Sequence, residues 1–107
     1  MKRAMKVSGK QLSGRRHRVF HLAPGLLLVF KPRGHREAVH AHGHGQRLRV
    51  LRGVLRVAIG QRRCTLRPGS PPLSIAAGRS HETFAVRDTW VVAESRERSQ
   101  RRPRLEP

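Results

Sequence analysis

Cysteine, aromatic residues and acidic residues are all scarce in this chain of 107 residues. The single cysteine, Cys64, cannot form an internal disulfide, and a lone thiol fits a reducing compartment. Tyrosine is absent, and the aromatic side chains are those of Phe20, Phe30, Phe84 and Trp90. So few rings, without a zinc-finger or RNP-like motif, disfavour a protein that recognises nucleic acid by base stacking.

Long hydrophobic runs are also missing. The strongest one, residues 26–30 (LLLVF), is far shorter than the about 20 apolar residues of a membrane-spanning helix, and it predicts a buried strand. The basic N-terminal residues do not lead directly into an apolar region, as they do in a secretory signal. We therefore expect a soluble, cytoplasmic protein without a membrane partner.

The charge is strongly one-sided, because 24 Lys and Arg residues face only 6 Asp and Glu residues, for a net charge of +18. Such a charge attracts polyanions, although a coding bias toward arginine explains it equally well. Residues 1–12 and 96–107 are rich in basic residues and lack apolar periodicity. They predict a basic N-terminal arm and a basic, disordered C-terminal tail on either side of one domain, residues 13–95.

Within that domain, apolar and polar residues alternate and turn residues recur, which predicts short β-strands. The expected strands are residues 15–21, 26–31, 37–42, 46–51, 54–59, 62–66, 73–75, 81–86 and 89–94. No segment shows convincing helical periodicity. Nine strands in fewer than a hundred residues indicate an all-β sandwich or small barrel.

Three histidines and a glutamine lie at spacings that suit a metal ion. Side chains two residues apart on a strand share a face, so His40 and His42 project together, and Gln46 has the same parity. His81 follows much later and reaches the same point only if the sheet curls. Three imidazoles and an amide oxygen suit a divalent transition metal: Zn, Ni, Fe, Mn or Cu. Ordinary polar histidines in a metal-free barrel are the alternative.

The remaining histidines have simpler interpretations. His44 shares the parity of His40 and His42, but it lies in a glycine bend and is interpreted as an exposed loop residue. His17, His21 and His35 are interpreted as solvated surface residues.

The spacing of the histidines resembles the first sequence motif of the cupins. That motif reads Gly, five residues, His-x-His, three or four residues, Glu, six residues, Gly. This chain has Gly34, His40, His42, Gln46 and Gly53 at matching intervals. Gln in place of Glu is a variation known in small cupins, including those that process unsaturated uronates.

A second stretch resembles the other cupin motif, which reads Pro-Gly-Asp and then Pro-x-Gly-x-x-His. It appears here as residues 68–70 (PGS) and 76–81 (AAGRSH), so Ser70 replaces the usual Asp and Ala76 the usual Pro. The resemblance covers about residues 26–95.

The resemblance implies a double-stranded β-helix, the cupin jelly-roll barrel, with His40, His42, Gln46 and His81 as metal ligands. Such a site leaves coordination positions open for water or substrate. Glu94 falls near the position at which uronate-processing cupins carry a catalytic Asp, so it is the candidate catalytic residue, provided that it faces the lumen. The alternative is an exposed glutamate at a strand end.

We therefore predict a metal-binding small cupin, an enzyme of isomerase, lyase or dioxygenase type that acts on a small oxygen-rich molecule. Lys31 and Arg79 are candidates to bind an anionic substrate, or else outward-facing charges. The alternatives are a ligand-sensing cupin module without catalysis and a charge-driven binder of nucleic acid or an acidic partner, which is not favoured. A homodimer is expected, because jelly rolls of this size cover exposed sheet edges by pairing.

Overall fold

The structure, a computed structural model, describes residues 15–95, which form nine β-strands and no helix. The strands are β1 (Arg18–Ala23), β2 (Leu26–Lys31), β3 (Arg36–His40), β4 (Gln46–Arg52), β5 (Leu55–Ile59), β6 (Arg62–Leu66), β7 (Leu73–Ile75), β8 (His81–Ala85) and β9 (Thr89–Ser95). Each expected strand is present, with bounds that differ by a few residues at most. The predicted arm at 1–12 and tail at 96–107 lie outside the described residues. In the part of the chain described here, no helix is long and apolar enough to cross a membrane.

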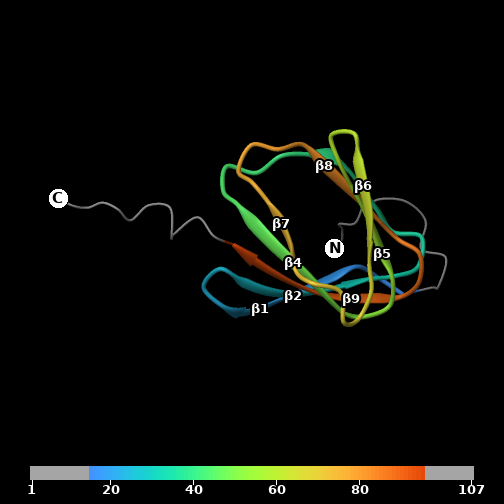
Figure 1. The fold of residues 1–107 in the computed structure, drawn as a ribbon. Helices are drawn as coiled ribbons and strands as arrows, with labels where there is room; N and C mark the ends of the chain where they lie inside the picture. The colour runs from blue at the N-terminus through green and yellow to red at the C-terminus, as the bar shows by residue number, and fades with distance from the viewer. Residues whose placement is uncertain (1–14, 96–107) are drawn as a thin grey trace.

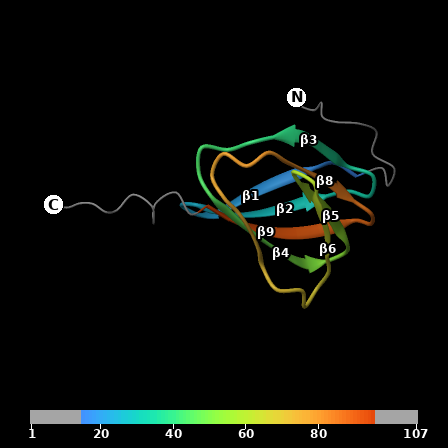
Figure 2. The ribbon, with the colours of Figure 1, turned by 45° about the horizontal axis from the view of Figure 1, so that its top comes forward.

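The strands form two antiparallel sheets that face each other (Figure 1). The five-stranded sheet has the order β1-β2-β9-β4-β7, and the four-stranded sheet has the order β3-β8-β5-β6. Figure 2 shows β1, β2, β9 and β4 side by side in this order. Because β9 pairs with both β2 and β4, the last strand of the domain lies at the centre of the larger sheet. This winding brings segments that are far apart in sequence to one interior.

Strict alternation of side chains directs one face of each sheet inward. In β5, for example, Leu55, Val57 and Ile59 are buried while Arg56 is exposed. The resulting core is aliphatic: Val29, Leu48, Val50, Leu55, Val57, Ile59, Leu66, Ile75, Ala85, Val91 and Ala93. Burial of these side chains between the sheets is the main force that holds the two layers together.

Gly53 joins β4 to β5 in a backbone conformation that glycine alone adopts readily. Its φ is +96°, and a Cβ there would collide with the backbone of Asp88 and with the hydroxyl of Thr89. That hydroxyl accepts a hydrogen bond from the backbone N–H of Val54 at 3.1 Å, so it cannot move aside without loss. The closing glycine of the first motif therefore has a steric role.

Replacing Gly53 with alanine is expected to lower the free energy of unfolding by about 2–4 kcal/mol, because strain and a backbone collision add together. Urea denaturation measures the loss. Gly43→Ala is the matched control, because a Cβ at Gly43 would meet nothing within 4 Å. Similar losses in both variants would contradict the steric role of Gly53.

Candidate metal centre

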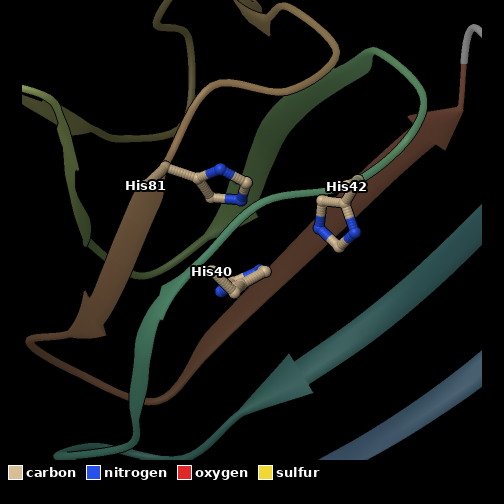
Figure 3. Close-up of side chains that lie close together, drawn as sticks. All are labelled: His40, His42 and His81. Carbon is tan, nitrogen blue, oxygen red and sulfur yellow. The ribbon is translucent and has the colours of Figure 1, made fainter.

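Three imidazoles meet inside the space between the sheets. His40 ends β3, His42 follows it in the next loop, and His81 begins β8. The pairing of β3 with β8 places His40 directly opposite His81. The ligating nitrogens of the three rings all lie within 4.8 Å of one another, and Figure 3 shows the rings gathered around one point. The curled sheet thus brings His81 to the pair His40 and His42, as the sequence predicted.

Hydrogen bonds fix the orientation of two of these rings. The Nδ1 of His40 lies 2.7 Å from the carbonyl oxygen of Ala38, and the Nδ1 of His81 lies 3.1 Å from that of Arg79. A carbonyl can only accept, so each Nδ1 carries the hydrogen and donates it. The Nε2 lone pair of each ring is then free, as in histidines that bind metals.

The environment of the third ring, that of His42, favours its neutral form. Burial lowers the pKa of His42, and the neighbouring His40 and His81 lower it further, because each would repel a second positive charge. A neutral imidazole keeps a lone pair for a ligand bond. The donor set of the three rings therefore fits a divalent transition metal.

Gln46 and His44 lie beside this triad in different ways. Gln46 begins β4, and it lines the same cavity as the three histidines, a position compatible with its predicted role as a ligand. The ring of His44 instead stacks on His42 with centroids 5.2 Å apart, and its Nδ1 lies 3.0 Å from the carbonyl of Gly45 and 3.3 Å from the hydroxyl of Ser95. His44 is half-buried, so its interpretation as an exposed loop residue was wrong.

The cavity at the triad has a volume of about 160 Å³. Its lining combines polar side chains with an aliphatic wall: His17, Val19, Leu27, Val29, Lys31, Glu37, His40, His42, Gln46, Leu48, His81, Thr83, Val91 and Ala93. One water molecule occupies about 30 Å³ of liquid, so the space suits a small molecule and little else.

Lys31 and Glu37 form an ion pair in the wall of this cavity. The Lys31 side chain is 7% exposed, and its Nζ lies 3.0 Å from Oε1 of Glu37. Lys31 therefore does not face outward. Burial alone would raise the pKa of the Glu37 carboxyl. The charge and hydrogen bond of Lys31, with smaller effects from His40 and His17, outweigh burial and lower this pKa to about 2. The Glu37 carboxyl is therefore ionised at neutral pH.

His17 and His35 stack on each other beside this ion pair, with ring centroids 4.4 Å apart and planes inclined by 10°. His35 is only 3% exposed and His17 is half-buried, so their interpretation as solvated surface residues was wrong. Burial first, and then the positive charges of His17 and Lys31, lower the pKa of His35 to about 4. The Nδ1 of His35 is buried without a hydrogen-bond partner among the described residues.

Glu94 lies away from the cavity. It is exposed on β9, and its Oε1 is 4.0 Å from Nε of Arg47 on β4. Its neighbour Ala93 lines the cavity, so the alternation of the strand directs Glu94 to the outer face. The catalytic role of Glu94 stays a prediction, and Glu37 is the carboxylate that lines the cavity.

The chain is similar in shape to solved cupin structures. KdgF from Halomonas sp. matches with a TM-score of 0.61 and 25% identity, over 78% of this chain and 82% of that one. A cupin superfamily protein from Desulfitobacterium hafniense matches with a TM-score of 0.67 and 10% identity, over 83% and 82%. No protein-family model matches this sequence, and no curated protein matches it significantly.

A ribosomal oxygenase from Escherichia coli, solved in complex with cobalt and succinic acid, has a TM-score of 0.61 and 20% identity. The match covers 65% of this chain and 22% of that one, so the likeness is to a part of the oxygenase.

The fold is therefore the cupin jelly roll, as the sequence resemblance predicted. Its histidine triad can hold a metal ion.

Proposed function

We propose that this cupin is a metal-dependent enzyme that acts on a small, oxygen-rich, anionic molecule. The observation that carries the proposal is the convergence of three imidazoles, with nitrogens within 4.8 Å of one another, on a cavity of about 160 Å³. A bound divalent metal would supply a Lewis acid that polarises a substrate oxygen. Isomerase, lyase and dioxygenase chemistry all suit such a centre.

The residues of the cavity have distinct roles in this proposal. His40, His42 and His81 hold the metal, and Gln46 is the fourth ligand. Because Gln46 is neutral, it does not reduce the positive charge of the metal. The metal would therefore be a stronger Lewis acid than in a site where Glu is the ligand.

The ion pair favours an anionic, hydroxyl-bearing substrate. The ammonium of Lys31 attracts a carboxylate or enolate oxygen, and the ionised Glu37 accepts a hydrogen bond from a substrate hydroxyl.

Activity of the metal-loaded protein on a panel of unsaturated uronates and 1,3-diketones tests the proposal. We expect turnover of at least one compound, and a fall of at least about 1,000-fold in kcat/KM in the His42→Ala variant, because a centre without one ligand no longer positions substrate. His21→Ala is the matched control, because His21 is exposed on β1 and does not line the cavity. Equal activity in both variants would contradict a metal-dependent reaction at this site.

The same panel separates the alternatives. Saturable binding of a panel compound without turnover would favour the ligand-sensing module over the enzyme. If a compound is turned over, the Glu37→Gln and Glu94→Gln variants identify the catalytic carboxylate. A larger fall in kcat/KM for Glu37→Gln would favour the carboxylate in the cavity. A larger fall for Glu94→Gln would favour the catalytic role predicted for Glu94.

A further inference from the structure

The outer face of the five-stranded sheet gathers three of the four aromatic residues of the chain. Val29 and Val91 line the cavity, so their neighbours Phe30 and Trp90 point to the opposite face of the sheet. Phe20, on the edge strand β1, faces the same way and is 40% exposed. The Trp90 ring lies 4.9 Å from that of Phe30 and 6.1 Å from that of Phe20, with the Phe20 and Trp90 rings stacked. Phe30 is itself only 1% exposed, and the guanidinium of Arg15 lies 5.3 Å from the centre of its ring, whereas Trp90 is half-buried. Phe20 and Trp90 therefore form the accessible part of this aromatic cluster.

Arginines flank this aromatic surface. The strand registers align two rows of side chains across β1, β2, β9 and β4, which lie side by side in Figure 2. The rows are Arg18–Phe30–Trp90–Arg52 and Phe20–Leu28–Val92–Arg49. The centre of the face is thus apolar, with an arginine at both ends of one row and at one end of the other.

The charge of this face is strongly positive. Arg18, Arg49 and Arg52 are exposed, and the guanidinium of Arg18 lies 5.8 Å from the centre of the Phe20 ring. Glu94 is the one carboxylate on the five strands of this sheet, and it pairs with Arg47. Few negative charges therefore offset the arginines.

From this arrangement we propose that the outer face of the five-stranded sheet binds single-stranded nucleic acid. Bases stack on the Phe20–Trp90 surface, and Arg18, Arg49 and Arg52 contact phosphates. Proteins bind single strands without base pairing through two features: accessible aromatic rings on the face of a sheet, and cationic side chains around them. The site lies on the opposite side of the sheet from the metal centre and does not depend on the proposed reaction.

Other occupants of the face fit it less well. A second copy of the chain also carries a net charge of +18, and a face-to-face pairing would bring arginines against arginines. An acidic protein would satisfy the arginines but would not use the stacked rings. Nucleic acid uses both.

Trp90 reports directly on this site, because it is the single tryptophan of the chain. Titration of the full chain with an oligothymidylate of about 12 nucleotides, a length within the range that single-strand binding sites cover, is expected to quench its fluorescence. Phe20→Ala, which removes the most exposed ring of the cluster, is expected to weaken binding about tenfold through lost stacking. An unchanged affinity in this variant would contradict stacking on the face.

Two charge-matched variants test which face binds. The triple variant Arg18→Gln, Arg49→Gln, Arg52→Gln is expected to bind at least tenfold more weakly. The slope of log affinity against log salt should fall by about 2, for three lost phosphate contacts. The control Arg56→Gln, Arg62→Gln, Arg63→Gln removes the same charge from exposed positions on the four-stranded sheet and should lose less than about threefold.

Three outcomes would overturn the proposal. Equal losses in the two triple variants would show that net charge alone retains the oligonucleotide. Equal quenching by oligoglutamate would identify an acidic polypeptide as the better occupant. A change in Trp90 fluorescence with protein concentration alone, together with sedimentation as a dimer, would show that a second copy covers the face.

Discussion

Replacing His81 with alanine is expected to abolish stoichiometric metal binding. His81 is 3% exposed, its ring is anchored through Nδ1 to a backbone carbonyl, and it is the one member of the triad on β8. Loss of a residue that merely orients a ligand costs about 10–100-fold in metal affinity, so loss of a ligand itself should cost more than about 100-fold. Elemental analysis after purification without added metal measures the content, and calorimetric titration with Zn²⁺ measures the affinity.

Three further variants make the metal prediction specific. His21→Ala should leave metal content unchanged, because His21 is exposed on β1. His44→Ala should have a modest effect, because His44 stacks on a proposed ligand without joining the triad. Gln46→Ala measures the contribution of the proposed fourth ligand. A His81→Ala protein that keeps one metal ion per chain would contradict the site.

Acid is expected to destabilise the metal-free protein through His35, starting near pH 6.5, before ordinary carboxyl groups begin to titrate. The pKa of His35 is lowered from 6.5 to about 4 in the folded state, so the unfolded chain binds a proton more readily. The contribution of His35 to the free energy of unfolding is therefore complete above pH 6.5 and is lost as the pH falls toward 4. The loss should reach about 2 kcal/mol by pH 5 and about 3 kcal/mol in total.

His35→Phe isolates this effect. The variant keeps a ring to stack on His17 but has no group to protonate and no unpartnered buried nitrogen. Urea denaturation at pH 7 and pH 5, in the presence of a chelator, should give a pH-dependent loss about 2 kcal/mol smaller than in the parent. The Glu37 carboxyl does not interfere, because its stabilising effect is lost only below pH 4.5. An identical pH dependence in the two proteins would refute the role of His35.

Local sequence was sufficient to predict most of the strands and the pairing of His40 with His42. Turn residues such as Gly25, Gly34 and Gly60 separate short alternating runs, and each of these glycines has a positive φ in the structure. The His-x-His pair needs only strand parity to face one side. The approach of His81 depended on the family resemblance, because no local pattern links residues forty positions apart.

Local sequence patterns could not predict the ion pair of Lys31 with Glu37 or the burial of His17 and His35. The register of β3 against β8 shifts between Glu37 and His40, so two residues of opposite parity both reach the cavity. Strand alternation also could not predict which way Glu94 points. The preceding residues, Trp90 to Ala93, are apolar on both faces and do not reveal which side of the strand is inward. Charged residues such as Lys31 are assigned to the surface by default, and only tertiary structure reverses that assignment.

The anchors of His40 and His81 have a consequence for how the protein can change over evolutionary time. Both imidazoles are oriented by carbonyl oxygens of the main chain, at Ala38 and Arg79, rather than by neighbouring side chains. Exchanging the residue at either anchor leaves its carbonyl in place, so mutations there can accumulate without turning the rings. Divergence around such a centre is limited chiefly by the path of the backbone.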